Sequence, residues 1–160
     1  MNRRKMLKKS FSLIVMLMLL FGCSRNAHQS VAKLIIAKEK MLLDEWGKGH
    51  TMIFPQNSAA EITYFDPSLE KRINGIQEFA ELLKPIENKF TIEKYEMLDP
   101  KVQVHGDVAV LSYNLVDYSK NPQGEEQKFL WNSTEVYKKM NDDWKIIHSH
   151  WSFTKPELKR

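Results

Sequence analysis

Four strand-like stretches follow one another in the second half of the chain, with only short turns between them. They are residues 89–98, 101–119, 128–140 and 143–153, and each is rich in β-branched and aromatic side chains. Turn-forming residues punctuate them: Asp99-Pro100, residues 121–124 and residues 141–143 between stretches, and His105-Gly106-Asp107 within the second. Consecutive strands joined by such short connections can pair only with their neighbours in opposite directions. This pattern predicts an antiparallel meander.

Both faces of this sheet carry apolar or aromatic side chains, although a sheet with one wet face should alternate more cleanly. Strand periodicity predicts which residues share a face. The sets are Asn114, Val116 and Tyr118; Ser133, Glu135 and Tyr137; and Ile147, Ser149 and Trp151, with Ile146, His148 and His150 opposite the last set. We therefore expect helices to cover one face and a partner subunit to cover the other, as in a homodimer.

The first half of the chain is mainly helical in pattern. From about Ser30 to Lys48, apolar residues recur at helical spacing, and Gly47 and Gly49 end the pattern. Residues 50–59 predict a short helix or a loop, residues 61–67 a strand, and residues 74–86 a second helix that begins at Asn74. Helices first and strands last predict an α+β fold with the helices on one face of the sheet.

The N-terminus has the pattern of a bacterial lipoprotein signal. A basic start and the apolar stretch FSLIVMLMLLF lead to LFGC, which ends at Cys23, the only cysteine in the chain. This predicts a signal peptide over 1–22, a lipidated Cys23 with a tether over 23–30, a domain over 31–155 and a tail over 156–160. The mature protein would be anchored by lipid to a membrane of the cell envelope, outside the cytoplasm.

The net positive charge of the chain comes from the predicted signal peptide. The sequence has 24 basic and 20 acidic side chains, and removing the five basic residues of 1–22 leaves 19 basic against 20 acidic. The remaining chain therefore offers no electrostatic argument for nucleic-acid binding.

The order of elements and three stretches resemble the nuclear transport factor 2-like superfamily. These stretches are residues 62–76, 97–113 and 133–152, and the likeness is greatest to SnoaL-like proteins and to the association domain of calcium/calmodulin-dependent protein kinase II. The resemblance implies a cone-shaped α+β fold, in which N-terminal helices pack on a strongly bent antiparallel sheet around a cavity. It also implies a dimer or a larger assembly. Some members of the superfamily are enzymes and others are binding or assembly modules, so the fold does not select a function.

The resemblance also places a ligand pocket. Positions that form an arginine-lined carboxylate pocket in the kinase domain fall here on Asn114, Glu135 and Trp151, and a histidine position falls on Phe79. Since none is arginine, the carboxylate ligand is not expected. The predicted lining suits an apolar molecule or a cation, and it comprises Trp46, Phe54, Tyr64, Phe79, Asn114, Glu135 and Trp151.

His148 and His150 lie two apart on one strand face, so they could share a metal ion, but zinc needs three or four ligands and no such cluster is near in sequence. We expect them at the sheet surface or subunit interface, and we expect no metal and no cofactor. Glu135 is a catalytic candidate, because a buried carboxyl can act as an acid or base.

The favoured function is binding of an unidentified small molecule by a membrane-anchored dimer. The alternatives are a cofactor-independent isomerase, dehydratase or hydrolase that uses Glu135 or a histidine, and an assembly module without a ligand.

Overall fold

The second half of the chain folds into four long strands, each antiparallel to the next. A computed structural model describes residues 28–121 and 123–154, and places these strands at β3 (Lys94–His105), β4 (Val108–Lys120), β5 (Glu126–Met140) and β6 (Asp143–Phe153). The antiparallel pairs are β3–β4, β4–β5 and β5–β6. The predicted meander is therefore confirmed.

Two shorter strands complete a mixed sheet of six. β1 (Ser58–Phe65) and β2 (Ile73–Asn74) extend it in the order β2-β1-β6-β5-β4-β3. β1 and β6 run parallel, although the other neighbours are antiparallel. A parallel pair needs a long connection between its strands, and here the whole of α3, β3, β4 and β5 lies between them.

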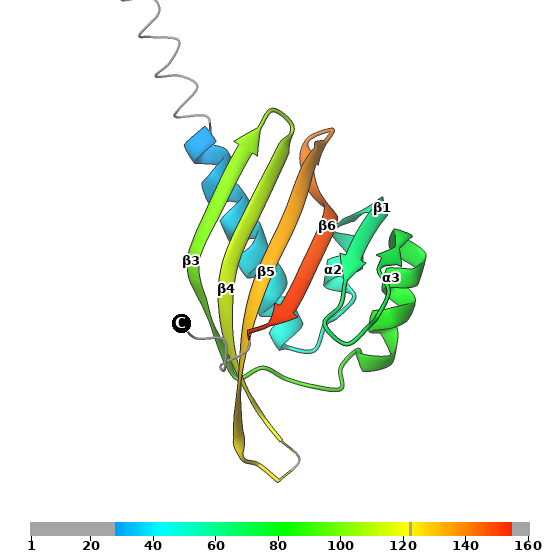
Figure 1. Cartoon of the computed structure of the whole chain (residues 1–160), viewed down its shortest axis with the longest axis vertical. Helices are drawn as coiled ribbons and strands as arrows, with labels where there is room; N and C mark the ends of the chain where they lie inside the picture. The colour runs from blue at the N-terminus through cyan, green and yellow to red at the C-terminus, as the bar shows by residue number, and fades with distance from the viewer. Residues whose placement is uncertain (1–27, 122, 155–160) are drawn as a thin grey trace, which may run out of the picture.

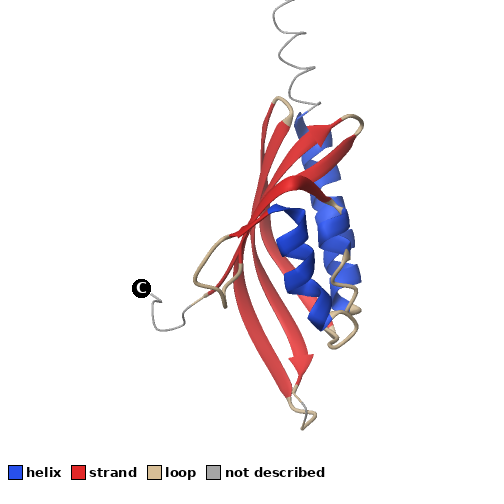
Figure 2. Cartoon of the chain, turned by 90° about the vertical axis from the view of Figure 1, so that its right-hand side faces the viewer, coloured by secondary structure: helices blue, strands red, loops and turns tan. Residues whose placement is uncertain are grey.

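The helices of the described residues cover one face of the sheet, which bends around them (Figures 1 and 2). The first helix spans described residues 28–47; α2 (Ile53–Gln56), α3 (Gly75–Leu83) and the 3-10 helix η1 (Lys84–Ile86) follow. The predicted α+β class, with helices on a strongly bent sheet, is confirmed. No helix in the described part of the chain is long and apolar enough to cross a membrane.

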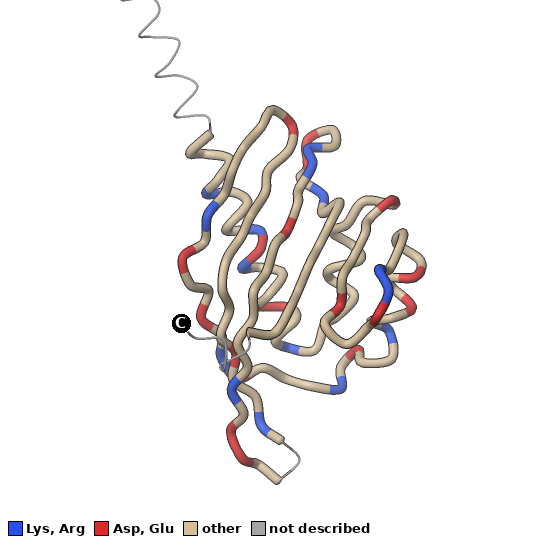
Figure 3. The backbone as a smooth tube through the Cα atoms, viewed as in Figure 1, with Lys and Arg blue, Asp and Glu red and all other residues tan. Residues whose placement is uncertain are grey.

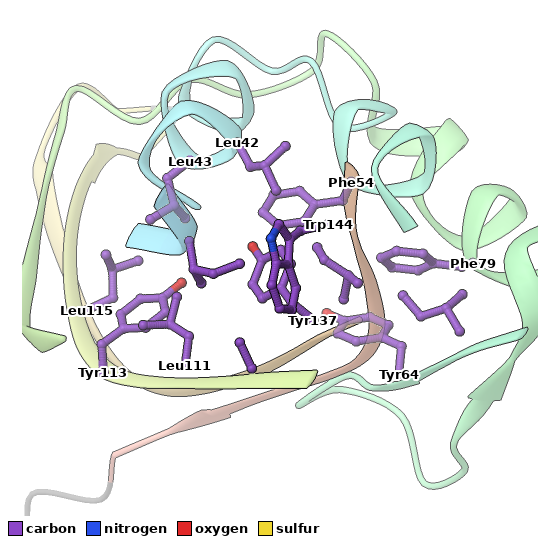
Figure 4. Packing of buried hydrophobic residues seen from close by; sticks show 14 of the residues in the cluster. Leu42, Leu43, Phe54, Tyr64, Phe79, Leu111, Tyr113, Leu115, Tyr137 and Trp144 are labelled. Carbon is purple, nitrogen blue, oxygen red and sulfur yellow. The ribbon is translucent and has the colours of Figure 1, made fainter. Parts of the chain in front are cut away.

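The hydrophobic core lies between this first helix and the concave face of the sheet. Ile35 and Leu42 of the helix and Ile62, Leu111 and Ile146 of the strands are fully buried. Tyr137, Trp144 and other large side chains fill the space between them, as Figure 4 shows. These contacts remove the apolar stripe of the helix from water, and such burial is the main stabilising term for a fold of this size.

The sequence pattern predicts that Asp99-Pro100 divides two strands, but it does not. Both residues lie inside β3, where the register with β4 shifts between Leu98 and Lys101, and Asp99 has a φ of 46°. The shift is a β-bulge. Proline is tolerated there because β3 is the edge of the sheet and the missing N–H faces no further strand.

A second irregularity lies at Ile147, where strand periodicity predicts the wrong faces. Val136 pairs with His148 and Tyr137 with Ile146, so Ile147 is an extra residue in β6. Ile146, which is fully buried, therefore shares the concave face with Ser149 and Trp151, not with the histidines. A one-residue insertion reverses the alternation beyond it, which is the physical reason for the error.

The predicted signal peptide, Cys23 and the 156–160 tail lie outside the described residues. Residues 28–30, expected as the end of the tether, are already helical. The predicted domain bounds stay predictions.

Candidate functional site

A cavity of about 310 Å³ lies between the helices and the concave face of the sheet. The end of the first helix supplies Trp46, α2 and α3 supply Phe54 and Phe79, and the strands supply the remaining wall. Seven aromatic side chains line it: Trp46, Phe54, Tyr64, Phe79, Tyr95, Trp131 and Trp151.

Five of the seven residues predicted to bind a ligand lie together in this cavity. Trp46 meets Phe54 edge to face at 5.6 Å between ring centres, and Tyr64 lies 4.9 Å from Phe79. Figure 4 shows Phe54, Tyr64 and Phe79 in the packed cluster. Trp151 meets Trp131 at 6.0 Å with the ring planes 81° apart. The rings thus support one another and hold the wall in shape.

Asn114 does not lie in the cavity with these five residues, and the ligand-binding role of the whole set stays a prediction. Its side chain is exposed on the convex face, where Nδ2 donates to Asn132 Oδ1 at 2.8 Å. Its neighbours Tyr113 and Leu115 are the residues of β4 that point toward the helices and are buried. Alternation along a regular strand then directs Asn114 outward.

Glu135 lies behind the cavity wall and is not one of the cavity-lining residues. Its Oε1 accepts hydrogen bonds from Ser149 Oγ at 2.7 Å and from Trp151 Nε1 at 2.9 Å, and both donors line the cavity. The side chain is fully buried, and its Oε2 has no hydrogen-bond partner among the described residues. Burial, followed by the nearby charge of Glu39, raises the pKa of Glu135 well above 4.5. Glu135 therefore acts on the cavity through the two side chains that it orients.

Glu39 is a second buried carboxyl, and the sequence reading missed it. It points from the first helix into the core, where Tyr113 donates to Oε1 at 2.6 Å and Tyr137 donates to Oε2. Burial raises its pKa above 4.5, while the two tyrosine hydrogen bonds oppose the rise. A signal was present: Glu39 follows Ile35 by four residues and precedes Leu42 by three, which places it on the apolar stripe.

Two other carboxyls, Asp66 and Asp117, line the cavity directly, and the sequence reading assigned neither to a ligand pocket. Asp117 on β4 is 5% exposed, and its Oδ2 accepts from Trp131 Nε1 at 2.5 Å. Asp66 follows β1 and accepts from Tyr64 OH at 3.0 Å and from Ser68 N at 2.8 Å. Burial raises the pKa of Asp117, and the Trp131 hydrogen bond opposes it. Asp117 shares the cavity side with Tyr113 and Leu115, so alternation on β4 was the available signal.

An open groove of about 610 Å³ adjoins the cavity beyond Trp131. Trp46, Ile92, Asp117 and Trp131 line both hollows. The groove also contains Lys89, and Lys120, which is paired with Glu93 at 2.6 Å. Trp131 and Asp117 thus lie where the aromatic cavity meets the outer groove.

The two histidines lie on the convex face, away from the cavity. His148 Nδ1 is 2.8 Å from Thr63 Oγ1, and the ring of Phe65 lies 5.9 Å from His148 and 5.5 Å from His150. Burial, followed by His150 and Arg72, lowers the pKa of His148. In the described ranges, no group of three or more His, Cys, Asp or Glu side chains is arranged to hold a metal ion. The interface role predicted for the histidines stays a prediction.

Comparison with known proteins places this geometry in a family. The sequence profile of the SnoaL-like domain matches residues 52–156. A solved structure of a candidate ketosteroid isomerase from Parabacteroides distasonis is 35% identical, covers 79% of this chain and 90% of its own, and has a TM-score of 0.69. The sequence has no significant match among curated proteins.

Two more distant structures share the fold. The association domain of the Caenorhabditis elegans kinase CaMKII is 23% identical over 79% of this chain and 98% of that domain, with a TM-score of 0.69. A nuclear transport factor 2-like protein from Salmonella enterica is 21% identical over 82% and 97%, with a TM-score of 0.65. The predicted resemblance is confirmed.

Proposed function

Because this chain belongs to the SnoaL-like domain family, we propose that it uses the family's cavity to bind a small molecule. The observation that carries the proposal is the aromatic lining of the 310 Å³ cavity, with a few fixed polar groups along it. Ligand sites commonly combine these properties, since apolar walls supply affinity and isolated polar groups set orientation.

Native mass spectrometry of the protein purified from its own host tests this proposal. We expect a copurified mass that is lost in Trp151→Ala, which opens the cavity wall, and kept in Phe129→Ala. Phe129 is the matched control because it lines the outer groove and not the cavity. Absence of any copurified species, together with no thermal shift across a metabolite library, would refute the proposal.

A second candidate function is proton transfer on a bound substrate. It is favoured by a cavity carboxyl, Asp117, whose pKa is raised by burial, and by the similarity to a candidate ketosteroid isomerase. Asp117 is better placed for this than Glu135, because Asp117 lines the cavity itself. If the chain isomerises an unconjugated ketosteroid, Asp117→Asn should lower the rate by about a hundredfold or more, the usual contribution of a general base. No turnover above buffer in an ultraviolet assay of the conjugated product would exclude ketosteroid isomerisation.

The chain is also proposed to be attached to a membrane of the cell envelope through Cys23. The support is the sequence alone: a basic start, an apolar stretch and a single cysteine at the expected cleavage point. Expressed in a bacterial host with radiolabelled palmitate, the wild type should take up label and sediment with membranes. Cys23→Ser should do neither, and label in that variant would contradict the proposal.

The convex face of the sheet is the proposed dimer interface. It exposes Phe65, Leu98 and Leu130 at 41%, 41% and 37%, beside His148 and His150. Solved relatives of this fold include association and hub domains of kinases, which supports assembly. Light scattering should report a dimer for the wild type and a monomer for Leu130→Glu. Leu69→Glu, an equally exposed leucine in the loop after β1, should stay dimeric. A monomeric wild type at micromolar concentration would refute the interface.

A further inference from the structure

The charge of the cavity has one sign. Its eighteen lining residues include two carboxylic acids, Asp66 and Asp117, and none is lysine, arginine or histidine. Elsewhere in the described chain, basic and acidic residues are mixed along the backbone, as Figure 3 shows. The cavity therefore differs from its surroundings in carrying acids without bases.

Neither acid is neutralised by a cation of the protein. In the described residues, the hydrogen-bond donors to Asp66 are Tyr64 and Ser68, and the donor to Asp117 is Trp131, all of them uncharged. No salt bridge in the same residues involves either aspartate. Asp117 Oδ1 accepts no hydrogen bond there, so one oxygen of a nearly buried carboxyl is left for a ligand. A carboxylate in such a place gains most from a positively charged partner.

The basic groups of the outer groove and of the strands beside it lie outside the cavity lining. Lys89 lines the outer groove. Lys120 is paired with Glu93 at 2.6 Å in the outer groove. Lys94 and Lys128 lie over the ring of Tyr118, at 4.1 Å and 5.7 Å from its centre. None of these four lysines lines the cavity itself.

Aromatic walls add to the same preference. The face of a tryptophan or tyrosine ring attracts a cation, and the attraction grows when water is excluded. Trp46, Trp131 and Trp151 all line the cavity, and Trp131 also holds Asp117 in place through its N–H. An apolar body with one positive charge would therefore match the rings and the carboxyls together, whereas a carboxylate ligand would meet two like charges.

We propose that the ligand of this cavity is an organic cation, a protonated amine or quaternary ammonium carried on an apolar body, with its charge at Asp117. This inference rests on the proposed small-molecule function and specifies its ligand class. The ammonium replaces the missing protein cation at Asp117, and the aromatic walls take up the rest of the molecule.

Three probes of matched shape test the charge preference: 2-phenylethylamine, 2-phenylethanol and phenylacetate, which are cationic, neutral and anionic at pH 7. Isothermal titration calorimetry should rank them in that order, with the amine about tenfold tighter than the alcohol, as cation–π and charge pairing of ordinary strength would give. Phenylacetate should bind more weakly than the alcohol.

Asp117→Asn removes the charge while Asn Oδ1 can still accept the Trp131 N–H, so the wall should keep its shape. We expect this variant to reduce the preference for the amine to less than about threefold. Asp142→Asn, the same change in the exposed turn before β6, should leave the preference unchanged.

Equal or tighter binding of the alcohol or of phenylacetate would overturn the cation inference and leave small-molecule binding intact. Failure of all three probes to bind would also overturn it, and the copurification experiment then decides the wider proposal separately. A preference that survives in Asp117→Asn but disappears in Asp142→Asn would place the charge site on the surface and equally overturn it.

Discussion

Glu39 and Glu135 are two carboxyl groups that the fold buries together beside the cavity. Four hydroxyl or indole donors serve them: Tyr113 and Tyr137 for Glu39, and Ser149 and Trp151 for Glu135. None of these donors is charged, and the two acids repel one another when both are ionised. The pair is therefore most stable with at least one proton bound.

This arrangement predicts that folding stability falls as pH rises. Burial raises the pKa of both acids above 4.5 in the folded protein, so the folded state keeps protons that the unfolded chain releases. Stability from these groups is complete below about pH 4.5 and is lost as pH rises toward the folded pKa values, by up to about 1.4 kcal/mol per pH unit for each proton. Glu135→Gln should reduce this slope in urea unfolding between pH 5 and 8.

Glu61→Gln is the control, because Glu61 is exposed on β1. Its slope should match the wild type. Parallel stability curves for the wild type and Glu135→Gln over that range would show that Glu135 is not a retained proton site.

Single residues of the site were predictable where a regular pattern held. The five aromatic positions, Trp46, Phe54, Tyr64, Phe79 and Trp151, come together in the cavity as predicted. Glu39 was missed because a carboxyl on the apolar stripe of a helix looks like an interruption of that stripe. Its burial is tolerable only because Tyr113 and Tyr137 donate hydrogen bonds to it. Those partners lie 74 and 98 residues away along the chain, and local patterns do not reveal them.

At the level of elements, β-bulges decide which side chains reach the cavity. The extra residue Ile147 turns Ser149 and Trp151 to the concave face below a buried Ile146. Without it, Ile146 and Trp151 would face opposite sides of the sheet, as simple alternation predicts. Alternation is a reliable guide only between bulges, and the sequence around Ile147 has no glycine or proline to mark this one.

The turn after the first helix allows a prediction about folding stability. Gly49 has a φ of 88°, and a Cβ there would lie 2.7 Å from the carbonyl oxygen of Phe90. Gly49 O also accepts the N–H of Asn88 at 2.8 Å, so this turn fixes the end of the helix against the segment before β3. Gly49→Ala should therefore cost clearly more stability than the roughly 1 kcal/mol expected for the positive φ alone.

Gly106 is the matched control for that measurement. It also has a positive φ, 61°, but a Cβ there would meet no atom within 4 Å. Gly106→Ala should show only the backbone cost in chemical unfolding. Equal losses for the two variants would mean that the turn yields to the added methyl group.

Over the whole molecule, the first helix is part of the folded unit, although the family match begins only at residue 52. It supplies Ile35, Leu42 and Leu43 to the core, Glu39 to the buried acid pair and Trp46 to the cavity. Without it, the hydroxyls of Tyr113 and Tyr137 would lose their partner and the concave face would meet water.

We therefore predict that a chain of residues 52–160 will not fold cooperatively, whereas residues 24–160 will. Circular dichroism during thermal unfolding should show a single sharp transition only for the longer chain. A cooperative transition in the shorter chain would show that the helix is an accessory to an independently stable sheet.

The arrangement of the molecule was predictable to the level of fold class, because element order and the resemblance both indicated helices on a bent sheet. The parallel contact of β1 with β6 was not predictable. It joins strands some ninety residues apart, and it forms only because β6, the last strand in the sequence, packs beside β1. Pairings at that separation follow from the packing of the whole chain and leave no local pattern.

The first helix separates the start of the described chain from the cavity. Figure 1 shows this helix running along the sheet from the N-terminal side of the described chain. Residue 28 and Trp46 lie near its two ends, about 27 Å apart at 1.5 Å per residue, and Trp46 lines the cavity. If Cys23 holds the protein to a bilayer, the cavity stands away from the lipid on this spacer. If the cavity binds a small molecule, as proposed, that ligand would then come from the surrounding water, and the membrane would serve to fix the location of the protein.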